Sequence, residues 1–372
     1  MLVQISHTLR ILKAAGIACG FLRAKIGIRY LQAMHINDQK GEMSMLKLKY
    51  LFQNKDLAEM ILKNWSYDPE SLDMFQYYRI SSNAVYPFRD QGEVRLLRFA
   101  PVEEKNKINL RAELDFLRYL RTNQYGAMEA VPSHSGTELV EAHTPWGTYY
   151  ASVFKRVPGS QLGSIDLNDS ILYSYGQALG ELHHLSRAFM PEQKEKRWTY
   201  TDVLDWMQEI LKGFPGETAA LNEVEFLRTY FATWPMTQQN FGLIHYDFEL
   251  DNVFYDEGSQ SCYAIDFDDS MYHWYTMDVE QSLDSLREEI EPEQWEQKKQ
   301  LFLNGYWSEA GERYDLESMF PACRRFANLY GYVRMLRSVA EQWSYEPEWM
   351  SGLRARLTRI MTEKAEQFGH PL

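Results

Sequence analysis

Two short segments near the middle of the chain concentrate residues that could bind a metal ion and move a proton. In LIHYDFELDNVFYD, residues 243–256, His245, Asp247 and Asn252 follow the spacing H-x-D-x-x-x-x-N, and Asp266 comes 14 residues after the Asn. Carboxylate and carboxamide oxygens are ligands that Mg²⁺ accepts beside phosphate groups and water. A second carboxylate can accept a proton from a hydroxyl group. The pattern therefore predicts a metal and phosphate site, with Asn252 and Asp266 as ligands and Asp247 as the base.

The same acids could instead form a solvated surface or cap turns. Nine carboxylates lie within residues 247–278, and like charges this close repel unless cations offset them. Asp268 and Asp269 could cap the turn that follows or face a substrate. Tyr272 and His273 could line the pocket of that substrate or fill the core beneath it.

A hairpin would bring the two proposed metal ligands together. VFYD, residues 253–256, and CYAID, residues 262–266, have the apolar character of short strands. Glu257-Gly258-Ser259 supplies turn residues between them. We therefore expect Asn252 and Asp266 to lie at the same end of this hairpin.

The remaining pattern divides the chain into a strand-rich part and a helical part, which join near residues 155–162. Alternating apolar residues predict strands, and apolar residues at helical spacing predict amphipathic helices. Strands are predicted at 77–88, 92–100, 137–142 and 148–157, and helices at 46–65, 106–123, 169–189, 201–212, 217–233, 276–290, 293–306, 315–343 and 346–367.

These motifs resemble those of the aminoglycoside phosphotransferase and choline kinase superfamily, which has a protein-kinase-like fold. IDFDDSMYHWYTMD, residues 265–278, is similar to a loop of the homoserine kinase type II-like bacterial branch. The resemblance implies an α+β fold of two lobes. It predicts a small antiparallel-sheet N-lobe with a leading helix at 46–157 and a mostly helical C-lobe at 158–372, which carries the catalytic and metal loops.

The resemblance also implies a role for each residue of the two loops. Asp247 is similar to the catalytic base, and His245 would support it within the catalytic loop. Asn252 and Asp266 are similar to the Mg²⁺ ligands. Asp278 is similar to a later Asp that anchors the segment.

In the small lobe the resemblance implies a nucleotide site. Arg98 stands where the family has a Lys that pairs with ATP phosphate, and Glu113 stands where the helix Glu pairs with that Lys. Arginine can also hold phosphate, by a bidentate fork. No G-x-G-x-x-G precedes Arg98, so a different backbone segment must cover the phosphates. The hinge that receives adenine through backbone groups is predicted at Phe154, Lys155, Arg156 and Val157.

The function implied is transfer of the γ-phosphate of ATP, with Mg²⁺, to a hydroxyl group of a small molecule. Acids near the loops would suit an amine-bearing acceptor that is similar to homoserine, an amino alcohol or an aminoglycoside. Two alternatives stay open. One is a non-catalytic pseudokinase that binds nucleotide in a structural or spore-coat role, and the other is a protein Ser/Thr kinase, although no peptide-docking or activation-loop signal is found.

Composition limits the partners and the compartment. The net charge of −13 disfavours nucleic acid and anionic membranes as main partners. Three widely spaced cysteines, Cys19, Cys262 and Cys323, form no disulfide or zinc pattern, which is typical of the cytoplasm. No run of 18 apolar residues predicts a transmembrane helix. The oligomeric state is not predicted.

Residues 1–45 are predicted to be an N-terminal extension with two possible explanations. Arg10 and Lys13 flank a short apolar run that weakly resembles a signal peptide. Alternatively, the Lys-Gly-Glu triplet before Met43 and Met45 could be encoded by a purine-rich ribosome-binding site. In that case translation would start at one of these two methionines.

Overall fold

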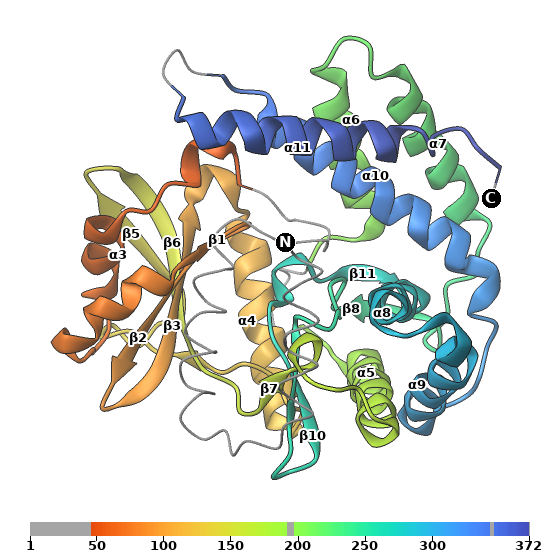
Figure 1. Cartoon of the computed structure of the whole chain (residues 1–372), viewed down its shortest axis with the longest axis horizontal. Coiled ribbons are helices and arrows are strands. Elements are labelled where there is room, and N and C mark those ends of the chain that lie inside the picture. The colour runs from red at the N-terminus through yellow and green to blue at the C-terminus, as the bar shows by residue number, and fades with distance from the viewer. Residues whose placement is uncertain (1–45, 192–196, 343–345, 372) are drawn as a thin grey trace, which may run out of the picture. The chain divides into compact units, whose positions relative to one another are not determined.

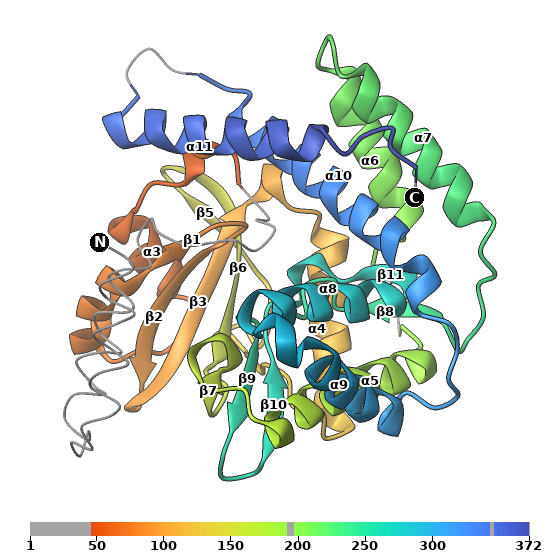
Figure 2. The same ribbon diagram turned by 45° about the vertical axis from the view of Figure 1, so that its right-hand side comes forward.

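The computed structural model describes residues 46–191, 197–342 and 346–371. The predicted extension at 1–45 lies outside them, so neither explanation of that segment is tested. The described chain combines an antiparallel sheet with a larger helical part, as Figures 1 and 2 show, and this confirms the predicted α+β fold class.

The strand-rich part forms one antiparallel sheet in the order β1-β2-β3-β6-β4, and β5 also pairs with β6. Its strands are β1 (Arg79–Ile80), β2 (Ala84–Asp90), β3 (Glu93–Pro101), β4 (Ala130–Val131), β5 (Val140–Thr144) and β6 (Gly147–Lys155). The register of β3 and β6 places Arg98 opposite Ser152 and Leu96 opposite Phe154. The predicted phosphate-binding residue therefore lies on the strand next to the predicted hinge.

Two helices of this part begin at asparagine caps, where a side-chain oxygen satisfies a free backbone N–H. Asn54 accepts a hydrogen bond from Leu57 N–H at 2.9 Å at the start of α3 (Lys55–Leu62). Asn106 accepts one from Ile108 N–H at 2.8 Å at the start of α4 (Lys107–Thr122).

The prediction of a single helix at 46–65 is wrong in extent. A 3-10 turn at Leu48–Tyr50 comes first, and α3 begins only after Asn54, whose backbone is extended. Leu48 is buried against Met350 and Leu357 near the C-terminus. The segment predicted as one helix is therefore interrupted at residues 51–54, because its first and last parts pack against different partners.

The helical part contains α5 (Asp169–Ala188), α6 (Tyr200–Lys212), α7 (Thr218–Ala232), α8 (Thr276–Glu289), α9 (Trp295–Glu309), α10 (Phe320–Val339) and α11 (Glu348–Ala365). Further 3-10 turns are at Pro69–Tyr77, Val102–Glu104, Leu162–Ser164, Phe267–Asp269, Pro292–Gln294 and Glu317–Met319. Gly176 of α5 lies so close to α9 that an added Cβ would be 1.9 Å from the Phe302 carbonyl oxygen. None of the described helices is long and apolar enough to cross a bilayer.

Two small sheets hold the loops that carry the candidate site. The predicted hairpin is confirmed as β9 (Val253–Asp256) and β10 (Ser261–Ala264), with β7 (Ser160–Gln161) on the far edge of β9. A second pair, β8 (Phe241–Ile244) and β11 (Met271–Trp274), was not predicted. The predicted catalytic loop, residues 245–252, follows β8, and the predicted metal loop, residues 265–270, precedes β11. The pairing of β8 with β11 brings these two loops together.

Candidate active site

The catalytic loop is held in place by Asp278, in the first turn of α8. Its carboxylate accepts hydrogen bonds from the backbone N–H of His245 at 2.8 Å and of Tyr246 at 2.7 Å. The Nε2 of His183, on α5, lies 3.0 Å from the same carboxylate. Tyr246 has a φ of 72°, which is unfavourable for a bulky residue. The anchor residue predicted by resemblance therefore fixes a backbone shape that would not form readily on its own.

We expect Asp278→Asn to destabilise the protein. An amide oxygen can still accept one of the two loop N–H groups, but the amide nitrogen would face another donor. Hydrogen bonds to a charged group contribute about 1.5–3 kcal/mol each, so the free energy of unfolding should fall by about 3 kcal/mol or more. Denaturant unfolding measures this effect. The exposed Asp284→Asn, on the same helix, should change stability by less than about 0.5 kcal/mol, and an equally small effect of Asp278→Asn would contradict the anchoring role.

His245 connects the catalytic loop to the metal loop. Its Nδ1 accepts a hydrogen bond from Asp247 N–H at 3.2 Å, so the proton resides on Nε2, which donates to the Ile265 carbonyl at 2.9 Å. Burial lowers the pKa of His245 to about 4. The ring is thus neutral near pH 7, as these two bonds require, and this geometry suits the supporting role predicted for His245.

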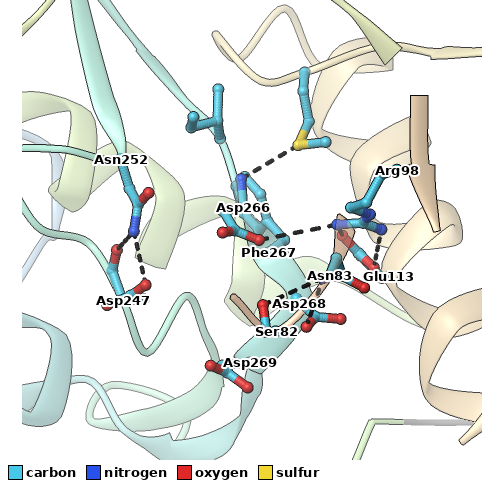
Figure 3. Close-up of polar contacts among 12 residues, drawn as sticks. Ser82, Asn83, Arg98, Glu113, Asp247, Asn252, Asp266, Phe267, Asp268 and Asp269 are labelled. Atoms are coloured by element: carbon cyan, nitrogen blue, oxygen red, sulfur yellow. Dashed lines mark hydrogen bonds and ion pairs between the residues drawn. The ribbon is translucent and has the colours of Figure 1, made fainter. Parts of the chain in front are cut away.

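Asp247 and Asn252 contact each other directly. The Asn252 Nδ2 donates to the Asp247 carboxylate at 2.7 Å and to the Asp247 carbonyl at 3.0 Å. Figure 3 shows these two side chains on one side of Asp266, with Arg98 on the other. Burial raises the pKa of Asp247 well above its usual range, and nearby acids that include Asp266 and Asp269 raise it further. The predicted residues are therefore gathered at one place.

Asp266 is held in an unusual backbone conformation at the end of the hairpin. Its φ is 63° and its ψ is 59°, in the left-handed region that Asp and Asn tolerate better than most residues. Its side chain is 36% exposed, and one carboxylate oxygen lies 3.9 Å from Arg98 Nη1. Burial and the neighbouring Asp268 raise the pKa of Asp266 to about 6, against the opposing effect of Arg98. A cation beside this carboxylate would stabilise its charged form against the effects of burial and of Asp268.

The side chains at this place could supply Mg²⁺ with two protein ligands, but not with a complete shell. No cluster of three or more His, Cys, Asp or Glu side chains is arranged as a metal site within the described residues. Mg²⁺ commonly takes one or two protein oxygens and completes its shell with phosphate and water. Because the Asn252 nitrogen makes both bonds to Asp247, its amide oxygen is the atom suited to a cation. Asn252 and Asp266 are therefore chemically suitable as such a pair.

Arg98 and Glu113 form the predicted pair. Both guanidinium Nη atoms donate to the Glu113 carboxylate, at 2.8 and 2.7 Å, and both residues are buried. The guanidinium also lies 4.7 Å from the centre of the Phe154 ring. These contacts fix the Arg98 side chain between α4 and β6.

The predicted hinge consists of the last two residues of β6 and the two residues that follow it. The Lys155 N–H donates to the Glu129 carbonyl at 2.9 Å, and the Arg156 N–H lies 3.4 Å from the Val94 carbonyl. Within the described residues, no protein group accepts a hydrogen bond from the Val157 N–H. That N–H could therefore donate a hydrogen bond to a ligand, as the hinge prediction requires.

A cavity of about 370 Å³ adjoins the metal loop, and Asp268 and Asp269 both line it. Asp268 pairs with Lys105, and Asn83 donates to it at 3.1 Å. Asp269 accepts from Arg334, on α10, at 2.9 Å. Both acids line the cavity, and their carboxylates bind side chains of other elements rather than cap the turn, so the geometry favours the role facing the cavity.

Sequence reasoning missed the basic residues that hold this loop. Arg197 is buried and donates to the carbonyls of Phe267, Asp268 and Ser270 and, at 2.9 Å, to that of Asn109 on α4. Lys105 and Arg334 reach the loop from other elements, and such contacts leave no local pattern. A weak signal existed for Arg334, a charged residue within the apolar stretch LYGYVRML.

Tyr272 and His273, for which the sequence left a substrate pocket and the core open, both contact the core. They point to opposite sides of β11, and neither lines the cavity of about 370 Å³. Tyr272 packs against the core that contains α5 and α9. His273 is fully buried, with its ring against those of Phe231 and Phe326. These contacts favour the core alternative for both residues.

We expect His273→Phe to reduce acid sensitivity, although the Trp274 N–H loses its acceptor and the variant should be about 1–3 kcal/mol less stable at pH 7. The His273 Nδ1 accepts from Trp274 N–H at 2.9 Å, which leaves a buried Nε2 without a partner in the described residues. Burial lowers the pKa of His273 to about 3, whereas an unfolded His has a pKa of about 6.5. The contribution of the neutral His273 ring to the free energy of unfolding is complete above about pH 6.5. Below that pH it falls by about 1.4 kcal/mol per pH unit.

Denaturant unfolding at pH 7 and pH 5 tests this expectation. Between the two pH values the Phe variant should lose about 2 kcal/mol less than the native chain. Equal losses in both proteins would show that His273 does not contribute to acid sensitivity.

Comparison with known proteins identifies the family of this chain. Residues 79–313 match the phosphotransferase enzyme family, and because the match covers more than half of the chain, the protein belongs to that family. The amicoumacin kinase of Bacillus subtilis (strain 168) is 25% identical over 218 residues, which are 56% of this chain and 62% of the relative. The matched part of the chain therefore spans less than two thirds of that relative's length.

Solved structures establish the kinase-like two-lobed fold. A structure of amicoumacin kinase in complex with AMP-PNP, Ca²⁺ and Ami has a TM-score of 0.66 at 19% identity, and the match covers 87% of this chain and 97% of that one. A microcompartment-associated aminopropanol kinase has a TM-score of 0.62 at 19% identity, with 84% and 97% covered. At this identity, the likeness is evidence of fold alone.

Proposed function

We propose that the protein is an ATP-dependent kinase that phosphorylates a hydroxyl group of a small molecule. The observation that supports this most strongly is the convergence of three separate sequence regions at one place. The Asp247–Asn252 contact, the partly exposed Asp266 and the buried Arg98–Glu113 pair lie together in Figure 3. Phosphoryl transfer depends mainly on positioning and charge neutralisation, and these groups can provide both.

Each group has a distinct part in the proposed reaction. Asp247 accepts the proton of the acceptor hydroxyl, and Asn252 holds its carboxylate in place. Asn252 and Asp266 would hold Mg²⁺, which neutralises phosphate charge when it is bound with nucleotide. Arg98, oriented by Glu113, provides a fixed positive charge next to the phosphates. His245 and Asp278 maintain the loop geometry.

We infer that the acceptor is small and carries an amine. The relatives are named for amicoumacin and aminopropanol. A volume of about 370 Å³ is near the lower end of the range for small-molecule sites, about 300–1,000 Å³. A compact amino alcohol or amino acid therefore fits the cavity better than an aminoglycoside of several rings.

A panel of hydroxyl acceptors, incubated with the purified protein and Mg-ATP, tests the proposal. ADP formation and the mass of each acceptor would be followed together. The account expects at least one amine-bearing acceptor to gain phosphate as ADP appears. Nucleotide binding without transfer to any acceptor would favour the pseudokinase alternative, and transfer only to protein substrates would favour a protein kinase.

A further inference from the structure

Two residues that line the cavity beside the metal loop carry buried acceptor atoms that the proposed chemistry does not use. Glu104, at the end of the 3-10 turn before α4, has a side chain that is only 2% exposed. Its Oε2 lies 2.8 Å from Arg337 Nη2, on α10. Its Oε1 is buried and has no hydrogen-bond donor within the described residues. A buried carboxylate oxygen without a hydrogen-bond donor costs free energy. A ligand that donates a hydrogen bond to this atom would remove that cost.

A second unpartnered acceptor lies in the same cavity wall. Asn109, in the first turn of α4, lines the cavity, and its buried Oδ1 also has no donor in the described part of the chain. Its backbone carbonyl accepts from Arg197 Nη1 at 2.9 Å. The same guanidinium binds the Phe267 carbonyl at 3.2 Å. Arg197 thus fixes Asn109 relative to the metal loop.

The other walls show what kind of group could occupy this space. Trp198, Trp206 and Tyr330 provide aromatic surface, and Asp269 lines the cavity at the metal loop. The charge of Asp269 acts on Asp247, so this side of the cavity is near the proposed base. A molecule in the cavity could therefore place a hydroxyl group toward Asp247 and a different group toward Glu104.

We propose that Glu104 and Asn109 form a recognition subsite for a hydrogen-bond donor of the phosphate acceptor, either a primary ammonium or a second hydroxyl group. The proposal rests on the proposed kinase function, since it takes the cavity as the acceptor site. Glu104 accepts through Oε1 while Arg337 holds Oε2, and Asn109 accepts through Oδ1. The small lobe thereby selects the acceptor, and the loops of the large lobe carry out the transfer.

The test uses Glu104→Gln with Glu93→Gln as its matched control. In Glu104→Gln the amide oxygen would still accept the hydrogen bond from Arg337. The amide N–H groups would then lie where Oε1 of the native Glu104 is proposed to accept a ligand donor. Glu93 is exposed at the start of β3 and does not line the cavity. Amino alcohols and the corresponding diols and mono-alcohols are titrated into each protein by calorimetry. The KM for acceptor and for ATP is then measured with any acceptor that turns over.

Loss of one hydrogen bond to a charged group should weaken binding about 10- to 100-fold. We expect Glu104→Gln to raise the acceptor Kd and KM by this factor, with little change in the ATP KM, while Glu93→Gln behaves as the native chain. Preference for the amino alcohol over its diol in the native chain identifies the donor as ammonium, and the reverse identifies it as hydroxyl. Asn109→Leu should give the same loss.

The failures of the two proposals are distinguishable. Unchanged acceptor binding in Glu104→Gln, or no binding of any probe to the native chain, overturns the subsite even if phosphate transfer to another acceptor is found. Binding that depends on Glu104, without transfer of phosphate, supports the subsite and overturns the kinase function.

Discussion

Asp247→Asn should reduce kcat by about 10²–10⁴, the usual cost of removing a general base. The substitution suits this test because Asn keeps an oxygen that can accept the hydrogen bond from Asn252 Nδ2, now 2.7 Å from the carboxylate. The loop geometry should therefore survive. Burial and nearby acids raise the pKa of Asp247, so loss of its charge should not destabilise the fold. Steady-state kinetics and thermal unfolding are measured together.

Glu257→Gln is the control for this prediction. Glu257 lies in the exposed turn between β9 and β10, so its substitution removes an acid from the same segment without touching the site. Its kcat should equal that of the native chain. If Asp247→Asn also turned over at the native rate, Asp247 would not be the base.

Asp266→Asn should reduce Mg²⁺-dependent turnover by at least about 100-fold. Loss of residues that merely support metal ligands typically costs about 10- to 100-fold in metal affinity or activity, and Asp266 is proposed to bind the ion itself. The left-handed backbone at φ 63° is acceptable for Asn, so the substitution adds no backbone strain. Alanine would be a poorer choice, because it tolerates that conformation less well.

Titration of Mg²⁺ at fixed ATP provides the readout for Asp266→Asn. The half-saturating Mg²⁺ concentration should rise while the melting temperature stays near the native value. An unchanged Mg²⁺ dependence with near-normal turnover would contradict the assignment of Asp266 as a metal ligand. A collapse of the melting temperature would instead show that Asp266 is needed for folding.

Local patterns predicted the parts of the site that depend on short sequence distances. The hairpin between Asn252 and Asp266 is formed by strands four residues long on either side of a turn, and the strand and turn signals are adjacent in the sequence. The Arg98–Glu113 pair required the family resemblance, because a strand residue and a helix residue can also pair at the surface. The α+β fold followed from the order of strands and helices.

The remaining features depend on contacts between distant segments. Arg197 reaches the metal loop 70 residues or more along the chain, and no spacing rule predicts that. The two faces of β11 show a different limit. Alternation along a strand puts Tyr272 and His273 on opposite faces, but it does not say whether a face meets a cavity or a core. In this fold the His273 face is covered by the aromatic residues of α7 and α10.

Calorimetric titration of Mg-ATP into the native chain, Asp247→Asn and Asp266→Asn tests the central claim most directly. The account separates the proton acceptor from the metal site, so the two acids should differ in their effect on nucleotide affinity. We expect Asp247→Asn to bind Mg-ATP with nearly the native Kd, and Asp266→Asn to bind it at least about tenfold more weakly. Equal loss of affinity in both variants, or no Mg-ATP binding by the native chain, would contradict this division of roles.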